Sequence, residues 1–185
     1  MKSKLLALLV VGLLSIPMAA NATPITNGGF ETGDLTGWSC VGTADCFAGA
    51  VVHSGSFGFV GWDNDGFATL SQSTGTIVGA SYTFSFWSRG TVLEPGNILR
   101  YQIGAGPIVP VVETFGFAQT STTFTATGAT TLISFFFETD QNSGLWALDD
   151  ISVEPNAAVP EPASLALLGL GLVAVAARRH LKSQR

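Results

Sequence analysis

The sequence predicts an all-β domain, a sandwich or a barrel, between two apolar terminal segments. Runs rich in Phe, Val, Ile and Thr recur along the chain and are separated by clusters of Gly, Asn, Asp and Ser. This pattern is typical of short strands joined by turns. The many Gly and β-branched residues between the two ends disfavour long helices, so we expect little helix in the domain.

The N-terminal segment has the organisation of a signal peptide. Lys2 and Lys4 precede the apolar run 5–16, and Ala20-Asn21-Ala22 supplies a small-x-small cleavage pattern. We therefore expect residues 1–22 to be a secretory signal peptide that is removed on export.

The segment that follows, residues 23–158, has the length of one domain with one substantial core. Its alternation is clearest in 82–88, where the aromatic side chains of Tyr82, Phe84 and Phe86 share one face, which is predicted to be core. Phe135-Phe136-Phe137 is expected to be core on both sides of an inner strand. Strands are predicted at 48–53, 56–62, 67–72, 82–88, 98–103, 109–114, 122–126, 132–138 and 146–153.

The domain is strongly acidic once the terminal segments are removed. All 13 acidic residues lie between Glu31 and Glu161, where Arg89 and Arg100 are the only basic residues, and 13 minus 2 gives a net charge of −11. This balance disfavours binding to nucleic acid and to anionic lipid, because the chain has few cations to exchange for their counterions. It suits cation binding or simple solubility.

Two cysteines, Cys40 and Cys46, are the only ones in the chain. Export to an oxidising compartment predicts a Cys40–Cys46 disulfide. Because the closed loop is short, its stabilisation should be modest, about 2 kcal/mol. The spacing differs from Cys-x-x-Cys, which disfavours a redox or metal role.

The C-terminal segment is predicted to enter a membrane. Residues 163–177 carry no charge, and 15 helical residues reach about 22 Å, which makes a marginal transmembrane helix. Arg178, Arg179 and Lys182 follow at once and act as membrane-stop residues that place the C-terminus inside and the domain outside.

A proline-rich tetrad, Val159-Pro160-Glu161-Pro162, precedes this helix and predicts an extended, protease-accessible stretch. Pro160, Glu161 and Pro162, the short helix and the basic end together resemble the sorting signal of the PEP-CTERM family of exported bacterial proteins, over residues 159–185. The resemblance implies recognition by an exosortase in the inner membrane, removal of the tail, and delivery to the cell surface or the exopolysaccharide matrix. The alternative is an ordinary C-terminal membrane anchor.

Several segments of the domain resemble the galactose-binding-like jelly rolls found among bacterial carbohydrate-binding modules. The resemblance implies a jelly-roll β-sandwich over nearly the whole domain, whereas a shared fold does not fix an activity. The fragments that carry it are 27–31, Gly37-Trp38, 52–56, 70–72, 79–87, 124–127 and 148–153.

In that family an acidic residue after the first strand and an Asp in the last strand often share a structural Ca²⁺, which implies Glu31 with Asp149 or Asp150 here. Carbonyls near Asn27 or Ser54 and a water could complete the six to eight oxygens that Ca²⁺ takes. Because adjacent strand residues point to opposite faces, we expect only one of the two Asp side chains to point inward. The alternative is that one Asp accepts backbone hydrogen bonds while the other is solvated.

Two tryptophans are the candidate sugar platforms, because an exposed indole beside polar groups can stack on the CH face of a sugar. Trp62 lies beside Asp63 and Asn64, and Trp87 has the opposite parity from the core aromatics of its strand. Packing on the sheet is the alternative for both. Trp38 and Trp146 are expected to be structural, and Asp63-Asn64-Asp65-Gly66 is predicted to be a hairpin turn.

Enzymatic activity is not expected. The domain has a single histidine, His53, and has no Gly-x-Ser-x-Gly elbow, so a triad or zinc mechanism lacks its residues. The sequence therefore favours a non-catalytic module at the cell surface or in the matrix that binds exopolysaccharide. The alternatives are a structural or adhesive coat protein without a sugar site, and a glycan hydrolase.

Overall fold

The computed structural model describes residues 25–42, 45–62, 67–91, 96–139 and 144–156. These residues form ten β-strands and no helix, which confirms the predicted all-β class. The strands are β1 (Ser39–Val41), β2 (Asp45–Gly49), β3 (Gly58–Trp62), β4 (Ala68–Gly75), β5 (Ser81–Gly90), β6 (Ile98–Ile103), β7 (Val109–Pro110), β8 (Ala118–Thr125), β9 (Thr130–Glu138) and β10 (Trp146–Pro155).

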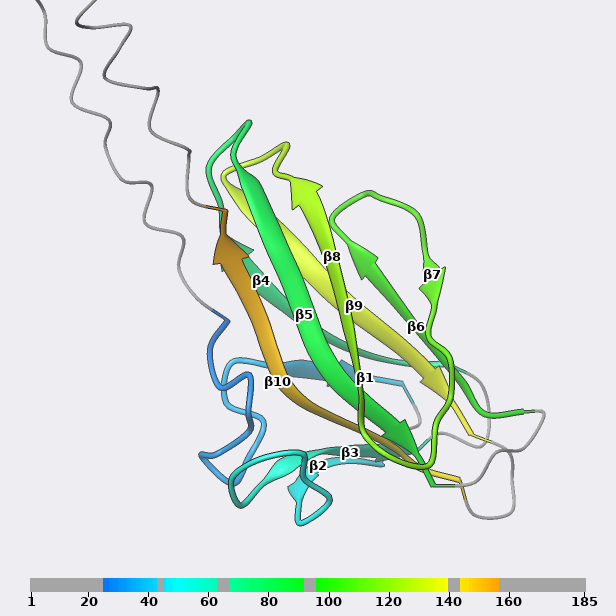
Figure 1. The fold of residues 1–185 in the computed structure, drawn as a ribbon. Helices are drawn as coiled ribbons and strands as arrows, with labels where there is room; N and C mark the ends of the chain where they lie inside the picture. Colours follow the sequence, from blue (N-terminus) through cyan, green and yellow to red (C-terminus); the bar gives the residue numbers. More distant parts are fainter. Residues whose placement is uncertain (1–24, 43–44, 63–66, 92–95, 140–143, 157–185) are drawn as a thin grey trace, which may run out of the picture. The chain divides into compact units, whose positions relative to one another are not determined.

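The strands form two antiparallel sheets of five strands each, packed face to face (Figure 1). The first sheet has the order β1-β4-β9-β6-β7 and the second the order β2-β3-β10-β5-β8. Since most consecutive strands lie in different sheets, the chain repeatedly crosses between the layers, as in a jelly roll. All ten strands lie in one compact unit that ends at Pro155, so this unit contains a complete core of its own.

The crossing between sheets corrects one expectation. Residues 63–66 lie outside the described part of the chain, but β3, before them, belongs to the second sheet and β4, after them, to the first. The segment therefore connects two layers and is not the turn of a hairpin.

Strand β5 shows why the apolar alternation predicted the core. Tyr82, Phe84 and Phe86 are fully buried, whereas the residues between them are only half-buried. A period of two in the sequence thus becomes one apolar and one polar face of the sheet.

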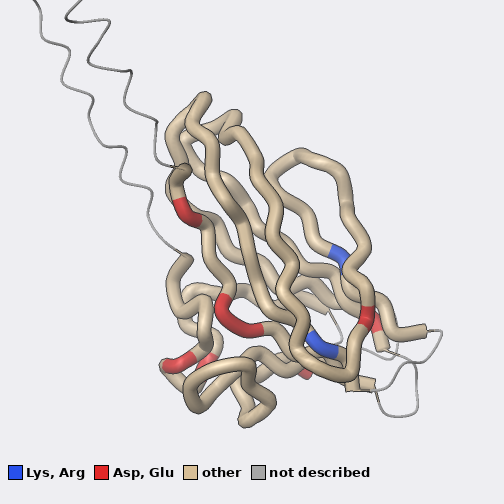
Figure 2. The backbone as a smooth tube through the Cα atoms, in the orientation of Figure 1, with Lys and Arg blue, Asp and Glu red and all other residues tan. Residues whose placement is uncertain are grey.

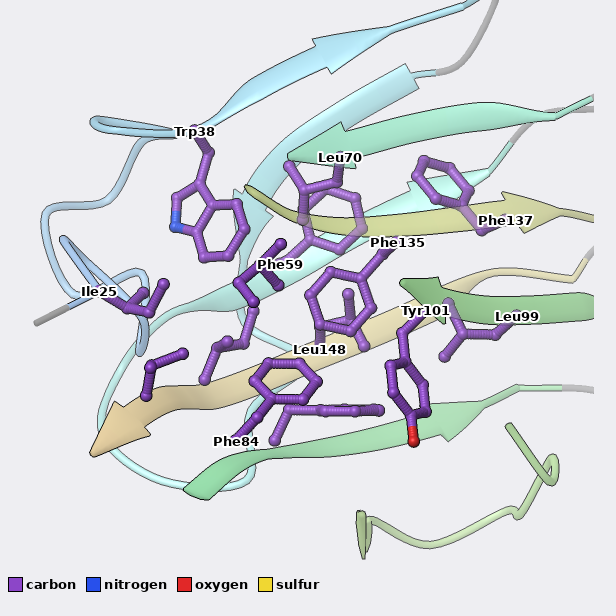
Figure 3. Packing of buried hydrophobic residues seen from close by; sticks show 14 of the residues in the cluster. Ile25, Trp38, Phe59, Leu70, Phe84, Leu99, Tyr101, Phe135, Phe137 and Leu148 are labelled. Atoms are coloured by element: carbon purple, nitrogen blue, oxygen red, sulfur yellow. The ribbon is translucent and has the colours of Figure 1, made fainter. Parts of the chain in front are cut away.

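The core between the sheets is dominated by aromatic rings (Figure 3). Phe86 and Phe135, from opposite sheets, meet edge to face with ring centroids 4.9 Å apart, and Phe84 lies 6.1 Å from Phe135. Such edge-to-face and tilted pairs add to the stabilisation from buried area. Trp38 and Trp146 are buried, as the sequence predicts for structural tryptophans.

Phe136 does not lie in the core, contrary to expectation. Phe135 and Phe137 are fully buried, but Phe136 between them is half-buried on the outer face of the first sheet. The expectation of core on both sides of β9 is therefore wrong, because the sheet is covered on one face only.

The Cys40–Cys46 disulfide is present as predicted. Cys40 lies in β1, an edge strand of the first sheet, and Cys46 lies in β2, an edge strand of the second. The disulfide therefore joins the two layers along one side of the sandwich. A disulfide that only closed one loop would not connect the sheets.

Other strand limits differ from the sequence prediction where apolar residues are few. The prediction missed β1, and it placed β2 at 48–53 although the strand runs over Asp45–Gly49. It started β8 at 122 although pairing with β5 begins at Ala118, in a stretch of hydroxyl and amide side chains. The segment 109–114 is a strand only at Val109–Pro110, although the backbone N–H of Val111 still donates a hydrogen bond to the Leu99 carbonyl of β6 at 2.9 Å.

The predicted signal peptide, residues 1–22, and the predicted sorting segment, residues 159–185, lie outside the described residues. Pro160, Glu161 and Pro162, the predicted transmembrane helix and the basic residues Arg178, Arg179 and Lys182 fall in that segment. In the described part of the chain, no helix is long and apolar enough to span a membrane.

Candidate functional site

A bulge in β10 brings two acidic side chains against the loop between β2 and β3, residues 50–57. The pairing of β10 with β5 shifts register between Asp149 and Ser152, and Asp150 has a left-handed backbone with φ of 47°. Bulges redirect side chains in this way. Asp149 and Asp150 both contact His53 and Ser54, but only Asp149 is buried, as expected, whereas the side chain of Asp150 is 36% exposed.

Asp149 anchors this loop to the strand. Its carboxylate is fully buried and accepts hydrogen bonds from the backbone N–H groups of His53 at 2.7 Å and of Ser54 at 3.0 Å. Burial raises the pKa of Asp149 above its ordinary value, against the opposing effect of the backbone donors.

Glu31 holds the next residues of the same loop. Its carboxylate accepts hydrogen bonds from the backbone N–H of Ser56 at 2.9 Å and of Phe57 at 3.0 Å. A Cβ atom on Gly55, whose φ is +66°, would overlap this carboxylate, so the close approach requires glycine.

The three predicted calcium ligands lie around one backbone position, Gly29. A Cβ atom there would lie 3.5 Å from a carboxylate oxygen of Asp150, 3.7 Å from one of Asp149 and 3.8 Å from Cγ of Glu31. In Figure 2 a long red segment lies near the middle of β10 and a short one lies near its C-terminal end. All three side chains border Gly29, and their predicted role as calcium ligands stays a prediction.

These carboxylate oxygens suit Ca²⁺ chemically, but several of them already accept hydrogen bonds from backbone N–H groups. The described residues include no group of three or more His, Cys, Asp or Glu side chains placed to hold a metal ion. The Asn27 carbonyl, an expected ligand, accepts hydrogen bonds from Phe30 and from the indole of Trp38, each at 3.1 Å. A site built on two carboxylates, those of Glu31 and Asp149, with Ser54 and water stays a prediction.

Trp87 stands beside the acidic cluster with one ring face covered. The His53 ring stacks on it with centroids 3.7 Å apart and an angle of 11° between planes. His53 also makes a 2.7 Å contact through Nδ1 with Asp150, and the edge of Phe117 approaches its ring at 5.7 Å. Imidazole therefore occupies one of the two faces that Trp87 could offer a sugar.

Trp62 is half-buried at the end of β3, on the outer side of the second sheet. Phe47 of β2 packs edge to face against it at 5.6 Å and is 43% exposed. The predicted polar neighbours Asp63 and Asn64 lie outside the described residues. Trp62 thus belongs to a small aromatic pair near the edge of the sheet.

A second surface was not foreseen from the sequence. On the outer side of the first sheet, Thr69 of β4, Phe136 of β9 and Arg100 of β6 form one cross-strand row. The guanidinium of Arg100 lies 5.0 Å from the centroid of the Phe67 ring, which is 43% exposed.

The next row on the same face consists of Ser71, Ser134 and Gln102. We call these two rows together with Phe67 the aromatic–polar face. Its signal in the sequence is parity alone, because Arg100 alternates with the buried Leu99 and Tyr101 and must therefore point outward.

The comparisons with known proteins concern two parts of the chain, the C-terminal segment and the folded domain. A profile of the PEP-CTERM protein-sorting motif matches residues 158–179. The chain carries a PEP-CTERM sorting signal. The search of curated proteins finds no match.

Solved structures with the same fold include carbohydrate-binding modules. The CBM22-1 xylan-binding domain from Paenibacillus barcinonensis Xyn10C has a TM-score of 0.55 at 13% identity, covering 71% of this chain and 94% of that domain. TmCBM61, solved in complex with β-1,4-galactotriose, has a TM-score of 0.53 at 22% identity, covering 70% of this chain and 96% of that one. This chain therefore has the jelly-roll fold of these modules.

The fold also occurs inside a larger protein. The enzymatically active domain of bacteriophage CBA120 tailspike protein 4 has a TM-score of 0.58 at 14% identity. The match covers 71% of this chain and 21% of the tailspike domain, so the chain spans about a fifth of its length.

Proposed function

We propose that this chain is an exported protein, displayed at the cell surface or in the extracellular matrix, whose jelly roll binds polysaccharide without cleaving it. The sorting motif at 158–179 supports export and processing by an exosortase-type membrane protease. The precursor would be anchored in the inner membrane with its domain outside. The fold shared with carbohydrate-binding modules supports the glycan as ligand.

The observation that carries the proposal is the aromatic–polar face. Sugars present apolar CH faces and a rim of hydroxyl groups, so a binding surface needs exposed rings beside flat hydrogen-bonding side chains. Phe67 and Phe136 supply rings, while Arg100 and Gln102 supply donors on an open sheet. Trp62, with Phe47, is the second candidate platform.

The negative charge of the domain limits the class of polysaccharide that it can bind. The span Thr23–Val159 has 12 acidic residues and two basic ones, and 12 minus 2 gives a net charge of −10, so acidic polysaccharides would be repelled. Neutral glycans are therefore the expected class.

The proposed binding surface has few residues that could catalyse hydrolysis of a glycosidic bond. His53 is held by Trp87 and Asp150, which fixes its ring within the scaffold of the loop. Phe67, Phe136 and Gln102 carry no acid–base group, so the proposed binding face has no pair of carboxylates to cleave a glycosidic bond.

A structural Ca²⁺ is part of the proposal. Glu31 and Asp149 come from opposite ends of the folded chain, and both face Gly29. A cation there would offset the repulsion between their charges and tie the first loop to the last strand.

The test is retention of the span Thr23–Val159 on insoluble xylan and on β-1,4-galactan. Saturable binding that is weakened in Phe136→Ala and in Arg100→Ala, and unchanged in Phe115→Ala, supports the proposal. Phe115 is the matched control, since it is a 59% exposed phenylalanine that follows Thr114, whose carbonyl accepts a hydrogen bond from Gly90 of β5 in the second sheet. Loss in Trp62→Ala alone would move the site to the second sheet.

An adhesive or structural role without a sugar site is the alternative. It is favoured by the same exported, acidic character, and it predicts no retention on any polysaccharide. Release of sugar from the tested material would instead indicate a hydrolase.

A further inference from the structure

The two sheets have four edge strands, β1 and β7 in the first and β2 and β8 in the second. An edge strand exposes backbone N–H and C=O groups that can pair with another chain. Proteins protect such edges by making them short, by placing charge or proline on them, or by covering them. The four edges of this sandwich differ sharply in this respect.

Three of the edges are protected. β1 has three residues and β2 has five, and the Cys40–Cys46 disulfide joins them side by side. β2 also begins with the charged Asp45. β7 has only two residues and ends in Pro110, which has no donor.

The fourth edge, β8, has none of these devices. It has eight residues, Ala118–Thr125, without proline, glycine or charge. It pairs with β5 along its whole length without a register shift, so it is straight and regular. In the described part of the chain no strand pairs with its other side.

The sequence around β8 is also uncharged, in a domain that is otherwise strongly acidic, and the guanidinium of Arg89 in β5, 5.8 Å from the centroid of the Phe117 ring, lies near its start. From Thr114 to Phe137 the sequence has no Asp, Glu, Lys or Arg. Figure 2 shows neither red nor blue along β8, whereas several acidic segments lie elsewhere on the unit. Two copies that meet edge to edge at β8 would therefore bring no like charges into contact.

The short β7 leaves the side of the sandwich beside β8 open. A hollow of about 190 Å³ lies there, lined by Tyr101 and Val109 from the first sheet and by Thr122 and Phe124 from β8. Phe124 faces inward yet is only half-buried. No element of the described chain covers this edge as the disulfide-linked strands cover the opposite one.

We infer that β8 pairs antiparallel with β8 of a second copy of this chain. The second sheets of the two copies would join into one sheet of ten strands, five from each copy. The contact is isologous, so it closes on a dimer and cannot extend into a fibre. The aromatic–polar face lies on the other sheet and stays free, and two such faces on one assembly would strengthen attachment by avidity.

The test uses the span Thr23–Val159, which contains all ten strands, and measures its mass by sedimentation equilibrium up to millimolar concentration. The variant Ser121→Lys/Thr123→Lys places two cations on the exposed positions of β8. In an antiparallel pair of identical strands these cations face each other and repel. We expect a dimer in the wild type and a dissociation constant at least about tenfold weaker in the variant.

The control is Val41→Lys/Ser73→Lys, which adds the same charge on exposed positions of the first sheet. It should dimerise like the wild type. Both variants make the domain less negative, so weaker dimerisation of the β8 variant could not come from greater overall repulsion. Melting temperatures show whether each variant is folded.

Hydrogen exchange supplies a second readout that a folding defect would not mimic. Amides of Ala118–Thr125 should become more protected as the wild-type concentration rises, and those of the β8 variant should not. A wild type that is monomeric throughout, or an equally strong dimer of the β8 variant, overturns the inference. Protection, in a monomer, of the β8 amides that point away from β5 would do so as well, since another segment of the same chain would then cover that edge. None of these results depends on sugar binding.

Discussion

Phe135 and Phe136 are adjacent in β9 but should have opposite effects when each is replaced by alanine. Phe135 is fully buried, and its ring meets those of Phe84, Phe86 and Trp38 at centroid distances of 6.1, 4.9 and 6.4 Å. Removing a buried phenylalanine side chain costs about 3–5 kcal/mol, because the cavity collapses only in part. The expected fall in melting temperature is roughly 10–20 °C for a domain of this size.

Phe136→Ala should leave stability nearly intact, with a loss of about 1 kcal/mol, because the side chain is only half-buried. It should instead weaken glycan binding. Loss of one stacking ring is expected to cost on the order of 1 kcal/mol, or roughly fivefold in affinity.

The assay pairs urea denaturation with binding to immobilised glycan for the two variants. Phe135→Ala should bind normally at a temperature where it is folded. Equal loss of stability in both variants would refute the assignment of one face of β9 to the core and the other to solvent. Normal binding by Phe136→Ala would remove the aromatic–polar face from the proposed function.

Three further outcomes are expected from other parts of the domain. Cys40→Ser/Cys46→Ser should lower the free energy of unfolding by about 2 kcal/mol, and an unchanged denaturation midpoint relative to the oxidised wild type would contradict the role given to the cross-link. Added Ca²⁺ should raise the melting temperature, and a chelator should lower it again. Glu31→Gln should abolish this response, whereas the control Glu154→Gln, at an exposed position, should keep it. A wild-type melting temperature that neither reagent changes would rule the cation out. The Thr32 hydroxyl at 2.7 Å and donors from Thr36 lower the pKa of Asp34, so its contribution to stability is present above the unfolded pKa and is lost as pH falls through the lowered one. Thr32→Val should raise that pKa toward 3.8 in a carboxyl NMR titration, and an unmoved titration would show that Thr36 alone is responsible.

Much of the fold could be predicted from the sequence because the core strands alternate strongly. Phe84 and Phe86 in β5, and Phe135 and Phe137 in β9, mark the inner face without reference to any neighbour. β8 could be predicted only in part, since half of its length has no apolar residue to show the period. The partner of each strand depends on contacts distant in sequence, which explains why 63–66 was expected to be a hairpin turn.

The candidate site could be predicted less completely, for two physical reasons. The sequence predicted Asp149 and Asp150 together with Glu31, but a bulge with left-handed Asp150 cannot be recognised from alternation. The stacking of His53 on Trp87 joins residues far apart in sequence, so nothing local to either of them indicates it. Parity did place Trp87 outside the core, as predicted, but it could not show what covers the ring.

The Cys40–Cys46 disulfide between β1 and β2 also makes the stability of the fold depend on the redox state of the compartment. Cytoplasmic thiols are kept reduced, so a newly made chain would lack the link between its two layers until it has left the cell interior. A pre-protein without that link is easier to hold unfolded for passage through the export machinery. Under the proposed export, oxidation outside the cytoplasm would then join the two layers after the chain has crossed the membrane.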